Sequence, residues 1–207
     1  MEVDRIANGL WRWTGFHEEW KHDVGCAYFE GDDAVCLIDP LVPPEDGDRF
    51  LAALDRDVSR LGVPVHILVT VFWHTRSARE LAERYGAEVW ASSRARAAVE
   101  RRAGRVRTFR PGDRLPGGIA AYATARSGEV VLYLPAERTL VAGDVILGAD
   151  DGALCLCPRS WLPTGVGHGE LRASLRPLLE LPVERVLVSH GTPVLVGGAA
   201  ALRELLA

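Results

Sequence analysis

The 207-residue chain is expected to fold as a four-layer αββα sandwich, in which two mixed β-sheets face each other and helices cover their outer sides. Three observations predict this class. The chain contains two strand-rich blocks, one near its start and one past its middle. Each block is followed by alternating helix and strand patterns. No repeat, low-complexity stretch or linker divides the chain, so residues 1–207 are expected to form a single domain.

The first strand-rich block is expected at residues 10–14, 25–30 and 34–39, where apolar stretches are separated by turn residues. Residues 48–61 carry apolar side chains near helical spacing and predict a helix. The continuous apolar run at residues 65–71 is typical of a strand that is buried on both faces.

A well-marked helix follows this run. Its apolar positions fall at i, i+3, i+4 and i+7: Ala78, Leu81, Ala82 and Tyr85. Gly86 is placed to end the helix, and residues 87–92 predict the next strand. The elements expected in the second half are strands at residues 118–124, 129–134, 139–145 and 185–190, and helices at residues 170–181 and 199–207.

Composition and charge argue against two classes of partner. The net charge of −4 offers no basic surface for nucleic acid or for an acidic membrane. The basic run at residues 94–107 is interpreted as the solvated face of a helix, with anion binding as the alternative. No apolar segment is long enough to span a bilayer and the N-terminus has no signal pattern, so a cytoplasmic protein is expected.

Three polar residues follow strands of the predicted sheets. His74 follows the apolar run, Asp144 follows the stretch "TLVAG" at residues 139–143, and His190 ends the strand that begins at residue 185. Strand ends in layered α/β folds are common places for chemistry, because loops converge there. Two imidazoles and one carboxylate are a metal-ligand set that leaves positions open for water or substrate.

The same segments resemble the metallo-β-lactamase superfamily over nearly the whole chain. The matching stretches are "VCLIDPL", "VTVFWHTRSARELAERYGAEVWAS", "GDRLPGGIAAY", "RTLVAGDVILG" and "RVLVSHGTPVL". The resemblance implies the αββα sandwich of that family. It also implies that Asp144 stands at the metal-bridging Asp and His190 at the last histidine ligand, with Asp39 as a carboxylate that supports a ligand rather than binding the metal.

One departure from the family pattern limits the metal content. The motif H-x-H-x-D-H falls on residues 69–74, where Val69 and Val71 replace two histidines and Trp73 replaces the aspartate. A later family histidine falls on Ala125. The resemblance therefore implies that one of two metal sites is lost, while His74, Asp144 and His190 keep three ligands of the other. At most one zinc or iron ion is expected, and a metal-free His–Asp pair is the alternative.

A substrate pocket is expected around these residues. The aromatic segment at residues 11–25 is expected to lie over the site and to supply an apolar wall, although its Trp residues could instead be core and its His residues exposed. A second candidate wall is residues 154–169. The predicted pocket residues are Trp13, His17, Trp20, His22, Val69, Val71, Trp73 and Ala125.

The function expected from these residues is hydrolysis of an ester, thioester or phosphoester with one metal ion, with Asp144 and His190 as the catalytic residues. Two alternatives stay open. One is an inactive ligand-binding or regulatory protein that keeps the fold without metal. The other is a structural subunit that acts through oligomerisation. In the first two hypotheses the partner is an unknown small molecule, and a homo-oligomer is compatible with all three.

Overall fold

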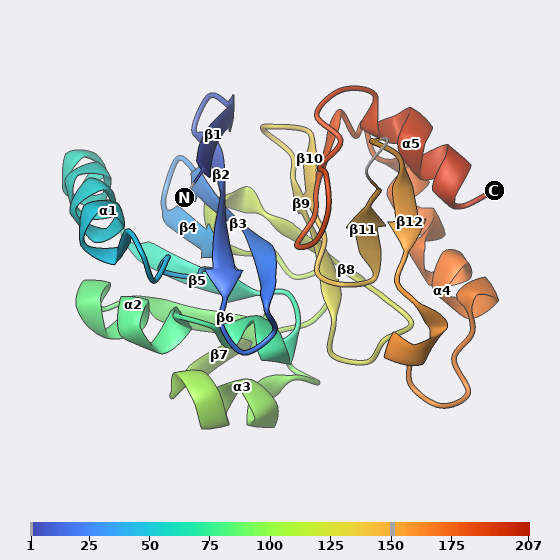
Figure 1. Cartoon of the computed structure of the whole chain (residues 1–207), viewed down its shortest axis with the longest axis horizontal. Helices are drawn as coiled ribbons and strands as arrows, with labels where there is room; N and C mark the ends of the chain where they lie inside the picture. Colours follow the sequence, from blue (N-terminus) through green and yellow to red (C-terminus); the bar gives the residue numbers. More distant parts are fainter. Residues whose placement is uncertain (1, 150–151) are drawn as a thin grey trace.

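Two β-sheets lie between two layers of helices in the computed structural model, which describes residues 2–149 and 152–207 (Figure 1). The larger sheet has the strand order β1-β2-β3-β4-β5-β6-β7. Its strands are β1 (Glu2–Ala7), β2 (Leu10–His17), β3 (His22–Glu30), β4 (Val35–Ile38), β5 (Val65–Val69), β6 (Glu88–Ser92) and β7 (Val106–Phe109). Strands β1 to β4 are antiparallel and β4 to β7 are parallel, so the sheet is mixed.

The smaller sheet has the order β13-β10-β9-β8, and a two-stranded ribbon lies beside it. The strands of the smaller sheet are β8 (Ala120–Ala123), β9 (Val130–Leu134), β10 (Thr139–Val141) and β13 (Arg185–Leu187), and those of the ribbon are β11 (Ile146–Gly148) and β12 (Leu154–Leu156). Short 3₁₀ helices are η1 (Phe72–Thr75), η2 (Pro116–Gly118), η3 (Arg159–Trp161) and η4 (Arg176–Glu180).

Helices cover the outer side of each sheet (Figure 1). Helices α1 (Gly47–Leu61), α2 (Ala78–Tyr85) and α3 (Arg96–Ala103) lie on the larger sheet, and α4 (His168–Leu175) and α5 (Gly198–Leu205) on the smaller one. Three apolar cores separate these four layers. One lies under α1–α3, one lies under α4 and α5, and a third lies between the two sheets. The predicted αββα sandwich is confirmed.

Helix α2 shows how the sequence determines these layers. Its buried residues are Ala78 and Leu81, which face the larger sheet. Gly86 has a φ of 61°, a left-handed conformation that costs a glycine little, and it ends the helix as predicted.

Several predicted elements have different ends. The apolar run at residues 65–71 leaves the sheet after Val69, because the Thr70 N–H donates to the Asp39 carboxylate rather than to a neighbouring strand. The strand predicted at 139–145 ends at Val141, because the N–H groups of Asp144 and Val145 donate to Glu129. The helix predicted at 170–181 begins at His168 and changes to the 3₁₀ helix η4 at Arg176, next to Pro177.

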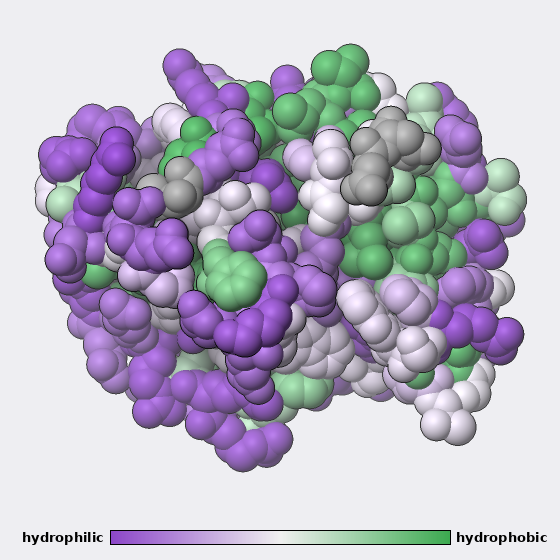
Figure 2. Space-filling model, in the orientation of Figure 1, coloured by the Kyte–Doolittle hydropathy of each residue, from purple (hydrophilic) through white to green (hydrophobic). Residues whose placement is uncertain are grey.

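Figure 2 shows how hydropathy is distributed over one face of the molecule. The side of α1–α3 is mostly hydrophilic, whereas apolar residues gather near the β11–β12 ribbon and the loop before α5. Val196 of that loop is 79% exposed. Among the residues that the structure describes, no helix is long and apolar enough to cross a membrane.

Candidate metal centre

His74 is fixed in one orientation at the end of β5. It lies in η1, its side chain is fully buried, and its Nδ1 lies 2.8 Å from Oδ2 of Asp39. Asp39 follows the neighbouring parallel strand β4, and its carboxylate also accepts hydrogen bonds from the N–H and hydroxyl of Thr70. Because an ionised carboxylate only accepts, the ring proton lies on Nδ1 and Nε2 is left free to bind.

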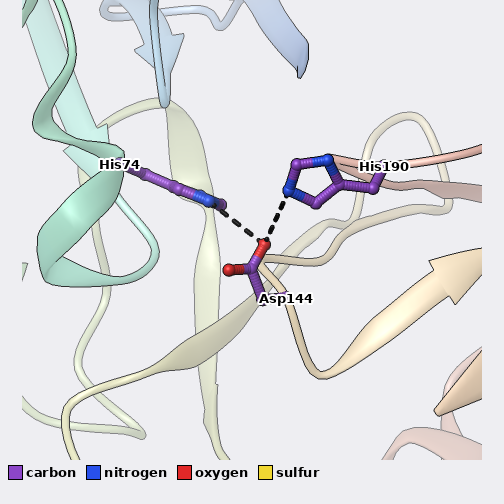
Figure 3. Close-up of side chains that lie close together, drawn as sticks. All are labelled: His74, Asp144 and His190. Atoms are coloured by element: carbon purple, nitrogen blue, oxygen red, sulfur yellow. Dashed lines mark ion pairs between the residues drawn. The ribbon is translucent and has the colours of Figure 1, made fainter. Parts of the chain in front are cut away.

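Asp144 lies between two histidines. Its Oδ1 is 3.1 Å from Nε2 of His74 and 3.4 Å from Nε2 of His190. Figure 3 shows both rings directed at this one oxygen from either side. Its other oxygen, Oδ2, accepts a hydrogen bond of 2.7 Å from the indole of Trp73. Three side chains that are far apart in the sequence therefore meet at one oxygen atom.

The three side chains fit a metal ion. They form the one group in the described part of the chain that is arranged to hold an ion, and their donor atoms lie within 4.8 Å of one another. Bonds of about 2.0–2.1 Å place neighbouring donors of a tetrahedral zinc site about 3.3 Å apart, close to the two spacings at Asp144. Nε2 of His74 and Oδ1 of Asp144 are buried and, apart from the ion pairs within this group, have no hydrogen-bond partner among the described residues, so an ion or a proton held between them completes the site.

The charges around His74 favour a bound cation or proton. Burial and the nearby Arg76 lower the pKa of His74, but the carboxylates of Asp39 and Asp144 outweigh them and raise it above its ordinary value. Burial would raise the pKa of Asp144, but the two histidines hold it far below its ordinary value. Without metal, an imidazolium between two carboxylates satisfies the same site.

A cavity of about 390 Å³ borders Asp144. Its lining residues are Trp20, His22, Trp73, Arg126, Asp144 and Trp161. Trp161 is 45% exposed, although indole side chains are usually more buried. A cavity of this size with three indoles in its wall suits a small, largely apolar ligand.

The predicted pocket residues divide into two groups. Trp20, His22 and Trp73 line the cavity, and His17 stacks on Trp20 with ring centroids 4.2 Å apart. Segment 11–25 is a hairpin in which β2 pairs with β3 and residues 18–21, which include Trp20, form the turn. Trp13 lies within β2 rather than in the turn, and it does not line the cavity. It is 2% exposed in the core under α1, because alternation along β2 turns it to the helix side of the sheet.

The three residues that the resemblance aligns with histidine ligands of the family do not line the cavity either. Val69 packs in the core under the helices of the larger sheet, and Val71 is 2% exposed. Ala125 packs at the edge of the core under α4, where its N–H donates to Ser174, and it lines a different hollow. Of the four residues that the resemblance aligns with ligand positions, Trp73 is the one that faces the cavity.

A buried ion pair was not predicted from the sequence. Arg126 and Glu129 lie 2.9 Å apart and are 4% and 2% exposed. Glu129 accepts hydrogen bonds from the N–H groups of Asp144 and Val145, so it positions the loop that carries Asp144. Burial raises the pKa of Glu129 to about 7, against the opposing effect of Arg126. The local sequence contains no pattern that predicts burial of an Arg and a Glu that lie three residues apart around a turn.

Arg76 is a second unpredicted residue near the site. Its guanidinium donates to the carbonyl oxygens of Gly25 and Asp39 and to the hydroxyl of Ser189, which precedes His190. Its φ of 33° is rare for a residue with a side chain. The contacts join three chain segments behind the site, so Arg76 fixes Asp39 and Ser189 relative to each other.

A sequence match to a known family over nearly the whole chain identifies the family of this protein. The sequence matches the family described as the metallo-beta-lactamase superfamily over residues 5–207. The chain belongs to the metallo-β-lactamase superfamily. No curated protein matches its sequence. The superfamily usually binds zinc, and this member keeps one possible His, Asp, His group for a metal.

Solved metallo-β-lactamases have the same fold as this chain. The structure of TMB-1 matches with a TM-score of 0.72 at 15% sequence identity, and the match covers 99% of this chain and 96% of the TMB-1 chain. A metallo-β-lactamase from Hirschia baltica has a TM-score of 0.69 at 15% identity, covering 99% and 95%. A β-lactamase domain protein from Burkholderia ambifaria has a TM-score of 0.73 at 17% identity, covering 99% and 71%. At these identities the likeness shows the fold alone.

Proposed function

We propose that this superfamily member is a hydrolase that uses one metal ion, held by His74, Asp144 and His190, to cleave an ester, thioester or phosphoester. The observation that carries the proposal is that two buried atoms able to bind a metal, Nε2 of His74 and Oδ1 of Asp144, lie 3.1 Å apart and have no hydrogen-bond partner in the described residues beyond the ion pairs of this site. Two imidazoles and a carboxylate suit zinc first and iron second. Such an ion, when bound, polarises a carbonyl or phosphoryl oxygen and lowers the pKa of water.

Neighbouring residues orient the three proposed ligands for metal binding. Asp39 keeps the proton of His74 on Nδ1, so Nε2 faces Asp144 with a lone pair. Trp73 holds Oδ2 of Asp144, so Oδ1 alone is left for the ion. The depressed pKa of Asp144 keeps it ionised, so it binds a cation rather than a proton at neutral pH.

A second ion has no comparable set of ligands. The positions that would hold it in the family carry Val69, Val71 and Ala125, and a valine or alanine side chain has no donor atom. We therefore expect little β-lactamase or glyoxalase-type thioesterase activity. The cavity beside Asp144, with its three indoles, instead suits a substrate that has an apolar body.

A metal-free binding protein is the second candidate. It is favoured by the raised pKa of His74, since a protonated ring between Asp39 and Asp144 needs no metal. In that case the cavity binds a ligand without turning it over.

The experiment is a panel of ester, thioester, lactam and phosphodiester substrates with added zinc, manganese or iron(II). We expect turnover with one ion per chain that is lost in His74→Ala and His190→Ala. His66→Ala is the matched control, because His66 lies on β5 but contacts Trp90 and Glu88 rather than the site. Turnover that requires two ions contradicts the proposal. If no substrate of the panel is turned over and no metal is bound, the result favours the binding protein.

A further inference from the structure

We infer that Arg126 binds an oxyanion of the ligand, so that the cavity takes a molecule with a flat apolar body and a carboxylate or phosphate-like group. This inference deepens the proposed function, because it names the ligand class for the same cavity. Its test does not depend on turnover or on metal.

The guanidinium of Arg126 is held rigidly at the cavity wall. Nη1 donates to Glu129 at 2.9 Å, and Nη2 donates to the carbonyl oxygen of Trp161 at 2.8 Å and to Sγ of Cys157 at 3.5 Å. The group also lies over the ring of Trp73, 5.2 Å from its centroid. A guanidinium that is fixed before the ligand arrives loses little entropy when it forms further hydrogen bonds.

This guanidinium still has hydrogen-bonding capacity. It carries five N–H groups, of which three donate to Glu129, Trp161 and Cys157, and its buried Nε has no hydrogen-bond partner in the described part of the chain. Arg126 is 4% exposed, yet it lines the cavity. A buried donor without a partner costs free energy, and an oxyanion in the cavity would satisfy it.

The position of Arg126 explains why a cation is useful there. It follows Ala125 in the chain and stacks on Trp73, and these two residues stand at positions where the family has metal ligands. Arg126 thus places a permanent positive charge beside two lost ligand positions. A guanidinium fork matches the geometry of carboxylates and phosphates.

The rest of the wall defines the body of the ligand. The indoles of Trp20, Trp73 and Trp161 provide apolar surface around the cavity. Trp161 is 45% exposed, and its own carbonyl oxygen is bonded to Arg126, so one residue joins the apolar wall to the charged group. A flat ring packed on these indoles, with its anionic group at Arg126, satisfies both features.

The test compares three probes with the same benzyl body on chelator-treated protein: phenylacetate, benzylphosphonate and the neutral phenylacetamide. Calorimetry measures each dissociation constant. We expect at least one anion to bind about tenfold or more tightly than the amide, because hydrogen bonds to charged groups are the stronger ones. Arg126→Gln should remove this preference and leave the weak affinity for the amide.

Arg107→Gln is the matched control. Arg107 is also paired with a glutamate, at 2.9 Å from Glu88, and stacked on a tryptophan, 4.8 Å from the centroid of Trp90, but its side chain is 60% exposed and outside the cavity. It should keep the preference for the anion. If Arg126→Gln does not fold, the double variant Arg126→Gln, Glu129→Gln removes both charges, while the amide oxygen introduced by Glu129→Gln can still accept from the N–H groups of Asp144 and Val145.

The outcomes separate this inference from the proposed function. Equal affinity for anions and amide, an anion preference that survives loss of Arg126, or no binding of any probe at millimolar concentration overturns the inference. None of these results bears on whether a metal binds at His74, Asp144 and His190. Which of the two anions binds better distinguishes a carboxylate ligand from a phosphate-like one.

Discussion

The indole N–H of Trp73 donates a 2.7 Å hydrogen bond to Oδ2 of Asp144. The resemblance to the motif H-x-H-x-D-H aligns Trp73 with the aspartate, which implies that a donor stands in place of an acceptor. The hydrogen bond from Trp73 fixes the orientation of the Asp144 carboxylate. Oδ1 of Asp144 is turned to the two histidines, at 3.1 and 3.4 Å, in the arrangement that we propose holds one ion.

Replacing Trp73 by Phe should weaken zinc binding about ten- to a hundredfold, the usual effect of losing a hydrogen bond to a metal ligand. The aromatic ring is retained, so the change isolates the donor. Trp90→Phe is the control, because the Trp90 indole donates to His66 outside the site. Competition with a chromogenic chelator measures both affinities. Unchanged affinity in Trp73→Phe would mean that the hydrogen bond does not orient Asp144.

Asp39→Asn should lower the stability of the metal-free protein by about 3 kcal/mol or more, because it leaves a buried His74 without its closest carboxylate. It should also weaken zinc binding, since His74 loses the acceptor at Nδ1. Urea unfolding in the presence of chelator measures the free energy of unfolding. The exposed Asp57→Asn is the control, and an equal loss in the two variants contradicts the role given to Asp39.

The pH dependence of stability follows from the raised pKa of His74 in the metal-free protein. When folding raises the pKa of a group, protonation of that group stabilises the folded protein. The full stabilisation is present below the pKa of the group in the unfolded chain, about 6.5 for histidine, and it is lost as the pH rises through the pKa in the folded protein. Unfolding free energy in chelator should therefore fall above about pH 6.5, and the fall should be smaller in His74→Gln. A wild-type profile that matches the His74→Gln profile would contradict the assignment.

Zinc binding should show the opposite trend, because the ion competes with the proton on Nε2 of His74. Affinity should rise with pH over the range in which the metal-free protein loses stability. Calorimetry in buffers of different ionisation enthalpy should detect release of a proton on binding. Binding without proton release near neutral pH would mean that His74 is already neutral.

Gly191→Ala should destabilise the protein by more than ~1 kcal/mol and weaken metal binding, because it moves the neighbouring His190. Gly191 has a φ of 81°, and an added Cβ would lie 1.8 Å from the carbonyl oxygen of Gly148. Gly62→Ala is the control, since Gly62 also has a positive φ of 64° but no atom within 4 Å of an added Cβ. Equal effects of the two changes on zinc affinity would show that the contact with Gly148 does not position His190.

The sequence was sufficient to predict the layers and the three central residues. The αββα sandwich followed from apolar periodicity and family resemblance, and both depend on local patterns. His74, Asp144 and His190 each follow a buried strand, and the fold brings the ends of these strands together.

The surroundings of these three residues were less predictable. Trp13 and Trp20 belong to the same aromatic segment, but only the strand geometry of β2 shows that Trp13 faces the core. Arg126 and Glu129 would be expected on the surface from their residue types, since burial of a charge is favoured only when its partner is in place. Contacts of this kind depend on tertiary structure, and no local spacing encodes them.

The most direct test of the single-ion site is the metal content of protein purified without chelator, measured by elemental analysis against protein concentration. We expect one zinc or iron ion per chain in the wild-type protein. We expect none in His190→Ala, while His66→Ala retains one. Two ions per chain, no ion in the wild type, or an ion that persists when His190 is removed would contradict it.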